Sequence, residues 1–210
     1  MMFEPILLIG AGGHAKSCID VIEQDGHYRV AGLVGLSHEV GNSVIGYPVL
    51  GSDNELPVLL KKYPTVLITV GHIKTAAPRI KLFEQVQQIG CRMPCIVSPR
   101  AYVSPHAKIE EGSIVMHGAI VNAGARIGRN CIINTKALLE HDVTVDDHCH
   151  ISTSSIINGY VTIGRGTFVG SGCRVRQSLI IGKNCLLGLG QLVLTDCADG
   201  SWLPVKKEIA

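Results

Sequence analysis

The sequence predicts an α/β domain followed by a narrow β-solenoid, and two observations predict this arrangement. Near the N-terminus, an apolar segment at residues 6–9 runs into a glycine-rich turn and then into a helical pattern, which is typical of a strand–turn–helix unit. Further along, every sixth residue from Val97 to Val193 is aliphatic, without exception. A strict period of six fits neither an amphipathic helix nor an ordinary strand. It indicates short repeats that bury their apolar residues by stacking on one another.

The first part of the chain reads as a small, Rossmann-like α/β domain with a parallel sheet. After the glycine turn, which spans Gly10 to His14, apolar residues recur at helical spacing. We expect further strands at residues 28–34, 66–70 and 92–97, an extended segment at residues 44–50 with a tight turn at Gly46-Tyr47-Pro48, and further helices at residues 54–62 and 76–89. Ligands of open α/β sheets bind at the carboxyl ends of the strands, which here include Gly10, Gly35 and Gly71.

The glycine turn is the first candidate binding site. Gly10, Gly12 and Ala15 fit the pattern G-x-G-x-x-G/A, in which the backbone approaches a phosphate at the N-terminus of a helix. A site for NAD would also need an acidic residue at the end of the second strand, but the chain continues there with Gly35 and Leu36. We therefore favour the phosphates of a sugar nucleotide over NAD, with a purely structural turn as the alternative.

A second series of residues supports the solenoid. Two positions before each aliphatic residue, the side chain is usually small, and one large and one small inward residue per repeat suits a narrow interior. The small residues are Ala101, Ala107, Ser113, Ala119, Ala125, Cys131, Ala137, Cys149, Ser155, Thr167, Cys173 and Cys185. Six of the eight cysteines share this register, so we interpret them as small buried side chains and not as disulfides or metal ligands.

Composition narrows the class of protein. The formal net charge is +2 and 17% of the residues are charged, which gives no reason to expect binding to nucleic acid or to an anionic membrane. No apolar run is long enough to span a bilayer, and the N-terminal segment lacks the features of a signal peptide. We expect a cytoplasmic protein.

The order of these motifs resembles the bacterial hexapeptide-repeat acetyltransferases of sugar nucleotides. The resemblance depends on the glycine turn, the small α/β domain and repeats that contain Asn134-Thr135, Glu140-His141-Asp142 and His150. Members of this family N-acetylate nucleotide-linked 4-amino-4,6-dideoxy sugars for O-antigen, capsule or other glycan synthesis, and relatives are sialic acid O-acetyltransferases. The resemblance implies a left-handed parallel β-helix, acetyl-CoA as cosubstrate, and a homotrimer with active sites between subunits.

The extent of the period of six gives the domain boundaries, and the strand ends and the resemblance together give the residue roles. Residues 1–96 would bind the sugar nucleotide, residues 97–195 would form the acetyltransferase β-helix, and residues 196–210 would be a C-terminal tail. His141 matches the general base and Asp142 the acid beside it. The acetyl-CoA site would contain His150, Gly159, Gly170 and Ser171. The substrate site would contain Gly10, Gly12, Gly13, His14, Gly35, Gly71, Asn122 and Asn134. Many members carry acidic residues after the second strand, so the nucleotide (UDP, dTDP or GDP) stays open here.

Elementary chemistry is consistent with these roles. Acetyl transfer from a thioester needs a base for the proton of the attacking amine, and a histidine titrates near neutral pH. His141 lies two residues after the inward-facing Leu139, so we expect it on an outward corner that a neighbouring subunit would enclose. A backbone N–H, of Gly159 or Gly170, would stabilise the oxyanion. The spacing of His141, His148 and His150 matches no familiar zinc site, and no metal is expected.

Three other functions stay open on the sequence. The first is an O-acetyltransferase that acts on a hydroxyl of sialic acid or a related sugar. The second is a scaffold protein in which the solenoid serves only for assembly. The third is a nucleotide-binding oxidoreductase, against which the missing acid after Val34 argues.

Overall fold

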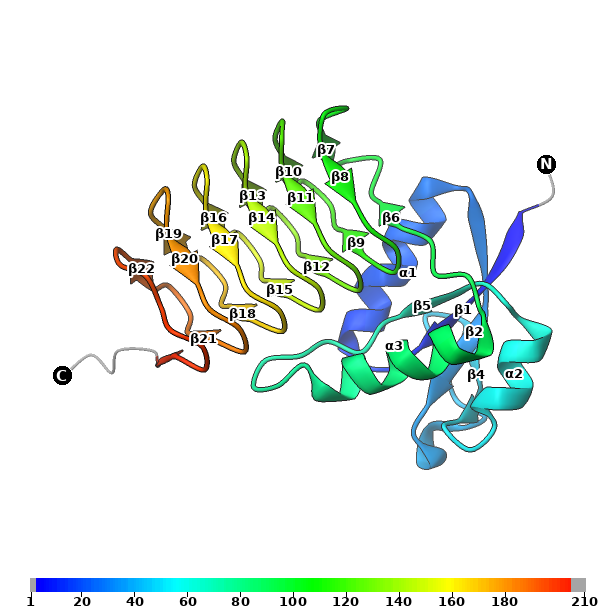
Figure 1. Cartoon of the computed structure of the whole chain (residues 1–210). Helices are drawn as coiled ribbons and strands as arrows, with labels where there is room; N and C mark the ends of the chain where they lie inside the picture. The colour runs from blue at the N-terminus through cyan, green and yellow to red at the C-terminus, as the bar shows by residue number, and fades with distance from the viewer. Residues whose placement is uncertain (1–2, 205–210) are drawn as a thin grey trace, which may run out of the picture.

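The computed structural model describes residues 3–204 as an N-terminal α/β unit followed by a β-helix (Figure 1). The first unit contains β1 (Glu4–Ile9), α1 (Gly13–Asp25), β2 (Tyr28–Gly35), η1 (Ser37–Glu39), β3 (Ser43–Val44), β4 (Tyr47–Ser52), α2 (Leu56–Lys62), β5 (Val66–Ile68) and α3 (Ala77–Ile89). No helix among residues 3–204 is both long enough and apolar enough to cross a membrane.

The N-terminal sheet has the order β3-β4-β2-β1-β5. All its pairs are parallel except β3 with β4, which form an antiparallel hairpin with positive φ angles at Ile45 and Gly46. One face of the sheet packs against α1, and the other packs against α2 and α3. The expected segment at residues 44–50, with a tight turn at Gly46-Tyr47-Pro48, is thus two strands joined by a turn at Ile45 and Gly46.

One predicted strand of this sheet is wrong. Residues 92–97 form no strand of the N-terminal sheet, and their pairing with it is an isolated bridge between Arg92 and Thr65. Ile96 and Val97 instead form β6, which pairs with β9 in the β-helix. The reason is the register: Val97 already belongs to the inward-facing series of the repeat.

The β-helix is left-handed and parallel, and three two-residue strands form each coil. Strands three apart in sequence pair with one another, so three sheets run along the solenoid. The six-stranded sheet contains β7 (Tyr102–Val103), β10 (Ile120–Val121), β13 (Leu138–Leu139), β16 (Ile156–Ile157), β19 (Arg174–Val175) and β22 (Leu192–Val193). The five-stranded sheet contains β8 (Lys108–Ile109), β11 (Arg126–Ile127), β14 (Thr144–Val145), β17 (Thr162–Ile163) and β20 (Ile180–Ile181).

The seven-stranded sheet contains β6 (Ile96–Val97), β9 (Ile114–Val115), β12 (Ile132–Ile133), β15 (His150–Ile151), β18 (Phe168–Val169), β21 (Leu186–Leu187) and β23 (Trp202–Leu203). The second residue of each strand faces inward, and these residues form one continuous core with the predicted small residues. The prediction of a hexapeptide β-helix is confirmed.

The outward residues give the three sheets different surfaces. On the seven-stranded sheet, Ile114 and Ile132 pack into the core of the N-terminal unit, under α1. On the six-stranded sheet, the large apolar side chains of Tyr102, Ile120 and Leu192 are exposed. On the five-stranded sheet, the outward residues of β8, β11, β14 and β17 are polar. One face is thus covered by the chain itself, one is apolar and open, and one is polar.

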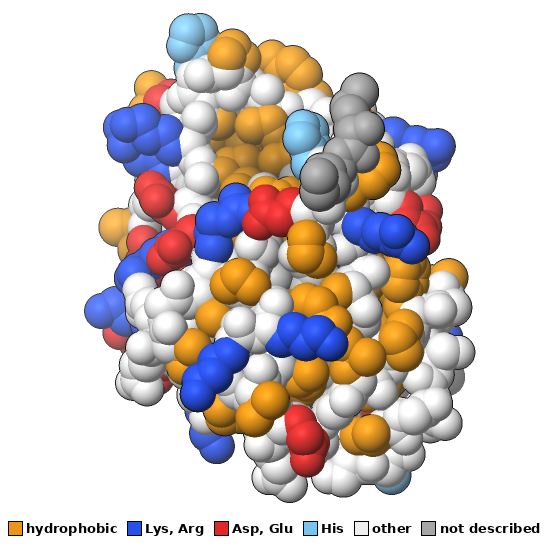
Figure 2. Space-filling view, turned by 90° about the vertical axis from the view of Figure 1, so that its right-hand side faces the viewer, with side chains coloured by type: hydrophobic (Ala, Val, Ile, Leu, Met, Phe, Trp, Pro, Cys, Tyr) orange, Lys and Arg blue, Asp and Glu red, His pale blue; other side chains and the backbone are white. Residues whose placement is uncertain are grey.

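The two ends of the β-helix differ. At the first coil, Val97, Val103 and Ile109 are only partly buried, and Figure 2 shows a hollow lined by hydrophobic side chains at this end. At the other end, strand pairing continues beyond residue 195. Cys197 bridges Ile181, and β23 pairs with β21 although the period of six has stopped at Val193. Residues 205–210 of the expected tail lie outside the described residues.

Candidate functional site

A pocket of about 1270 Å³ lies at the carboxyl ends of β1, β2 and β5, where the N-terminal sheet meets the seven-stranded sheet. Its wall includes eight of the predicted site residues: Gly10, Gly12, Gly13, His14, Gly35, Gly71, Asn134 and His150. It also includes residues that sequence reasoning did not single out: Glu39, Asp53, Thr69, His72, Lys74 and Thr153. The predicted nucleotide residues therefore line one cavity, together with two of the predicted site residues of the β-helix, Asn134 and His150.

The glycines of the turn have different structural surroundings. A Cβ atom on Gly10, whose φ is +122°, would lie 2.7 Å from the side chain of Val70, so this glycine allows β1 and β5 to approach. A Cβ atom on Gly12 or Gly13 would meet no protein atom within 4 Å. Contacts within the chain do not require these two glycines. They leave open space at the N-terminus of α1, where N–H groups and the helix dipole favour an anion.

Three histidines gather at the pocket. His150 donates its Nδ1–H to the carbonyl oxygen of His72 at 2.9 Å, and its Nε2 accepts from the Asn134 amide at 3.1 Å. The ring of His150 lies 5.5 Å from that of His72 and 6.3 Å from that of His14, between centroids. Burial lowers the pKa of His14 and of His72 to about 3 and that of His150 to about 4. All three rings are therefore neutral near pH 7.

An acidic side chain occupies the place where the sequence offered none. Glu39, in the short helix η1 after β2, folds back so that its Oε2 accepts the N–H of Leu36 at 2.7 Å. The same carboxylate lies against Gly35, where a Cβ atom would be 2.7 Å from it. Glu39 thus provides an acid at the end of the second strand, four residues after Gly35 in sequence.

His141 lies on a different corner of the β-helix, between β13 and β14. Its Nδ1–H donates to Asp142 Oδ2 at 3.0 Å, and its ring lies edge-on to Tyr160 with centroids 5.2 Å apart. A Cβ atom on Gly159 would lie 2.7 Å from the His141 ring, and one on Gly124 would collide with the Asp142 carboxylate. Two glycines, in the coils before and after, therefore make room for the His141–Asp142 pair.

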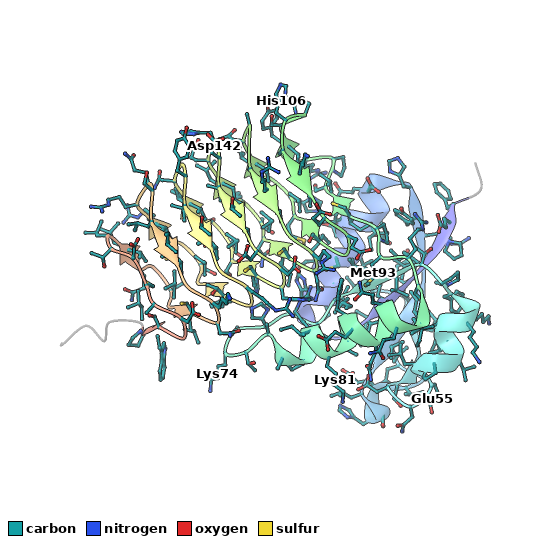
Figure 3. The ribbon with its side chains drawn as sticks, viewed as in Figure 1. Glu55, Lys74, Lys81, Met93, His106 and Asp142 are labelled. Atoms are coloured by element: carbon teal, nitrogen blue, oxygen red, sulfur yellow. The ribbon has the colours of Figure 1, made fainter. Side chains whose placement is uncertain are left out.

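The two asparagines predicted to lie near the acceptor sugar are far apart in the structure. Asn122 lies on the His141 corner and donates to Glu140 at 3.0 Å, whereas Asn134 lies at the pocket. Figure 3 shows Asp142 and Lys74 at opposite edges of the molecule, and Lys74 belongs to the pocket wall. Within one chain, His141 is therefore not at the pocket that holds the glycine turn.

Two further predicted residues lie along the seven-stranded sheet. A Cβ atom on Gly170 would lie 2.6 Å from the backbone of Gly188, so the stacking of two coils requires this glycine. The Ser171 hydroxyl lies 2.9 Å from that of Ser152, next to Thr153 in the pocket wall. No cluster of histidine, cysteine and acidic side chains among residues 3–204 has an arrangement that could hold a metal ion.

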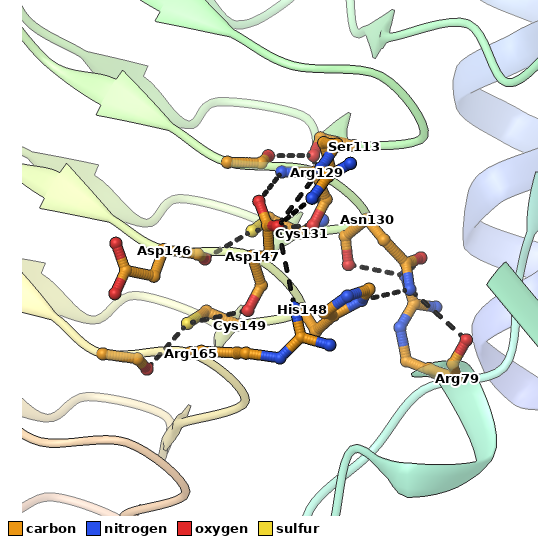
Figure 4. Close-up of polar contacts among 12 residues, drawn as sticks. Arg79, Ser113, Arg129, Asn130, Cys131, Asp146, Asp147, His148, Cys149 and Arg165 are labelled. Carbon is orange, nitrogen blue, oxygen red and sulfur yellow. Dashed lines mark hydrogen bonds and ion pairs between the residues drawn. The ribbon is translucent and has the colours of Figure 1, made fainter. Parts of the chain in front are cut away.

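A buried polar network behind the pocket was not predicted (Figure 4). Arg79 in α3 reaches Asn130 on a corner of the β-helix, and the Asn130 amide donates to Nδ1 of His148 at 2.9 Å. His148, which we had considered as a metal ligand, is buried edge-on against Phe83. The sequence alone could not predict this network, because Arg79 and Asn130 are far apart in sequence and lie in different units.

Comparison with known families and structures identifies what the chain is similar to. The PglD N-terminal domain family matches residues 5–86, and the bacterial transferase hexapeptide family (six repeats) matches residues 106–141. A variant of perosamine N-acetyltransferase from Caulobacter crescentus, with a histidine replaced by asparagine and in complex with CoA and GDP-perosamine, is 31% identical. The match covers 97% of this chain and 94% of that one, with a TM-score of 0.90.

Two other structures are similar. The acetyltransferase domain of PglB from Neisseria gonorrhoeae, in complex with acetyl coenzyme A, is 30% identical, with 97% of each chain covered and a TM-score of 0.86. WeeI from Acinetobacter baumannii is 20% identical with a TM-score of 0.82 over 95% of each chain, and at this identity the likeness concerns the fold alone.

Proposed function

The chain belongs to the hexapeptide-repeat sugar-nucleotide acetyltransferase family, and we propose that it transfers the acetyl group of acetyl-CoA to the 4-amino group of a nucleotide-linked 4-amino-4,6-dideoxy sugar. The single observation that carries this proposal is the open space at Gly12 and Gly13, in a pocket that extends to the β-helix. A free sugar has no phosphates for this turn to bind. The product would be a precursor for O-antigen, lipopolysaccharide or capsule synthesis in the cytoplasm.

The substrate residues follow from the pocket. The diphosphate would lie against Gly12, Gly13 and the N-terminus of α1, where the backbone N–H groups have no side-chain cap. Glu39 and Asp53 are the acidic groups of the wall and would bind hydroxyls of the ribose or the donors of a base. Asn134 would face the sugar end of the ligand, and His150, which the resemblance assigns to acetyl-CoA, is hydrogen-bonded to Asn134 in the same wall.

The reaction would proceed by direct attack. The neutral amine nitrogen attacks the thioester carbonyl carbon, a C–N bond forms, and the C–S bond breaks. Nε2 of His141 takes the proton that the amine loses, and the CoA thiolate leaves and is protonated. Asp142 accepts Nδ1–H and so holds the ring in the tautomer with a free Nε2 while stabilising the imidazolium. Gly159 lies against the ring, and its N–H would stabilise the oxyanion.

A second copy of the chain would complete the site. His141 and the glycine pocket lie on different corners of one β-helix, so an amine held in the pocket needs a His141 from another subunit. The exposed apolar face formed by Tyr102, Ile120 and Leu192 lies on one side of the His141 corner and would be covered in a homotrimer. Acetyl-CoA would then lie between neighbouring β-helices, near Gly159, Gly170 and Ser171.

The proposal is tested by the release of free CoA thiol from acetyl-CoA with a panel of acceptors. The panel contains UDP-, dTDP- and GDP-linked 4-amino-4,6-dideoxy sugars and free sialic acid. Turnover of a nucleotide-linked amine supports the proposal and names the nucleotide. If sialic acid were the only acceptor acetylated, the protein would be an O-acetyltransferase. If no acceptor caused thiol release, a scaffold role would be favoured.

A further inference from the structure

Arg79 is a buried cation without a counter-ion. Its side chain is 0% exposed, and among residues 3–204 no carboxylate lies within 4 Å of its guanidinium. All the acceptors that it reaches are neutral. Nη1 donates to the carbonyl oxygens of Ile68, at 2.9 Å, and Val70. Nη2 donates to Asn130, to its carbonyl oxygen at 3.1 Å and to its Oδ1 at 2.6 Å (Figure 4).

Burying this charge without a counter-ion destabilises the folded state. Moving a guanidinium out of water is unfavourable, and it is usually offset by an acidic partner. Neutral carbonyls satisfy individual N–H groups but do not cancel the charge, and Nε of Arg79 has no partner among residues 3–204. Burial lowers the pKa of Arg79 only to about 10, so the group is charged near pH 7. A purely structural tie between α3 and the β-helix would not need this charge.

The charge lies directly behind the pocket wall. Val70, whose carbonyl oxygen accepts from Arg79, is followed at once by Gly71 and His72, and all three residues line the pocket. The guanidinium is close enough to lower the pKa of His14, His72 and His150, as a secondary cause after burial. Since these rings are neutral and the only cation of the wall, Lys74, is exposed, Arg79 is the fixed buried positive charge at this pocket.

We propose that Arg79 is an electrostatic anchor for the diphosphate of the substrate: it attracts the two phosphates across the Thr69–Gly71 backbone without touching them. This inference rests on the proposed function, because it assumes that the pocket receives a nucleoside diphosphate group. The field of a buried charge is screened much less than that of a surface lysine, and it adds to the dipole of α1. The uncancelled charge that destabilises the empty protein would then stabilise the complex.

The charge can be cancelled with little change in shape by Asn130→Asp. Asn130 has a φ of +54°, which aspartate tolerates, and the new carboxylate oxygen would replace the amide oxygen that already accepts from Nη2. His148 can donate its Nδ1–H to the carboxylate in place of the lost amide donor. The matched control is Asn184→Asp, which makes the same substitution at the equivalent corner position, with a φ of +53°, three coils further along.

The measurement is calorimetric binding of UDP, dTDP and GDP and of the nucleosides uridine, thymidine and guanosine, with wild type and both variants. We expect Asn130→Asp to weaken the diphosphate that wild type binds by roughly tenfold or more, on the order expected for one unscreened charge. Binding of the matching nucleoside should be unchanged, and Asn184→Asp should behave as wild type. The pKa values of His14, His72 and His150, measured by NMR, should rise in Asn130→Asp.

The other outcomes separate the two proposals. If wild type binds a diphosphate and Asn130→Asp binds it equally well, the electrostatic role is wrong and the proposed function stands. If Asn130→Asp weakens the nucleoside as much as the diphosphate, Arg79 acts by shaping the end of β5, which also overturns the inference. If wild type binds none of the diphosphates, the nucleotide assignment of the pocket fails and the inference falls with it.

Discussion

A Cβ atom at Gly159 would lie 2.7 Å from Nε2 of His141. The absence of a side chain at Gly159, one coil after His141, therefore decides where the imidazole can lie. This relationship connects a position that the sequence suggested for acetyl-CoA with the position that it suggested for the base.

The first prediction concerns Gly159→Ala. Gly159 does not have a positive φ, so alanine strains no backbone there, but its Cβ atom would push the His141 ring away from its position. We expect kcat for acetyl transfer to fall about 10²-fold, as misplacement of a catalytic group by about 1 Å can do. Thermal stability should change little. An unchanged kcat in Gly159→Ala would contradict the positioning role.

The second prediction concerns the base itself. His141→Asn should abolish thiol release, since asparagine cannot take a proton from the amine, whereas CoA binding and oligomeric state should be retained because the His141 side chain is 56% exposed. The control is His106→Ala, on the same line of corners, which we expect to leave turnover unchanged. Near-normal kcat in His141→Asn would show that another group accepts the proton.

The third prediction separates binding from folding at the glycine turn. Gly13→Ala places a methyl group in open space at the first position of α1 and should stabilise the helix slightly, by at most about 1 kcal/mol. The same methyl group occupies the proposed phosphate site, so KM for the sugar nucleotide should rise at least about tenfold, from the steric clash with a backbone-bound phosphate. Denaturant unfolding and steady-state kinetics measure the two effects. An unchanged KM would place the phosphates elsewhere.

The fourth prediction concerns Glu39. Glu39→Gln keeps the acceptor for the Leu36 N–H but removes the charge and one acceptor site. We expect weaker binding of both the nucleoside and the nucleoside diphosphate, by calorimetry, because this carboxylate would contact ribose or base and not phosphate. Loss confined to the diphosphate would contradict that assignment. Glu55→Gln, in which the carboxylate also accepts a backbone N–H at 2.8 Å but lies outside the pocket wall, is the matched control.

The fifth prediction is a loss of stability in acid. Burial lowers the pKa of His72 in the folded state to about 3, whereas an unfolded histidine titrates near pH 6.5. The unfolded state then binds more protons below this pH, so the stabilisation is complete above pH 6.5 and is lost as the pH falls toward 3. His14, His148 and His150 act in the same direction. Urea unfolding should give a smaller free energy at pH 5 than at pH 7.5.

Replacement of His72 tests the origin of this acid sensitivity. Neither ring nitrogen of His72 has a partner within residues 3–204, so His72→Phe loses no side-chain hydrogen bond, and its backbone carbonyl still accepts from His150. The difference in unfolding free energy between pH 7.5 and pH 5 should become smaller in the variant. An unaltered difference would mean that His72 does not titrate on unfolding.

Several local features could be predicted because they depend on neighbouring residues. The period of six predicted a stacked solenoid, since each coil buries its aliphatic and small residues against the next, and the family resemblance specified a left-handed β-helix. The glycine turn predicted the end of β1 and the start of α1 for the same reason. The predicted strand at residues 92–97 was wrong because its sequence fits either unit. Val97 belongs to the six-residue register, so it lies in β6 of the β-helix and not in the N-terminal sheet.

The sequence by itself thus determined the repeat and the glycine turn, because hydrophobic periodicity and glycine geometry act over a few residues, and its resemblance to a known family supplied the candidate base. Only the tertiary structure decided which side chains meet. It brought Glu39 back to Gly35, set Arg79 against Asn130, and placed Asn122 and Asn134 on separate corners. These contacts depend on how helices and coils pack in three dimensions. Such packing is set by the summed burial of many residues, and no local pattern encodes it.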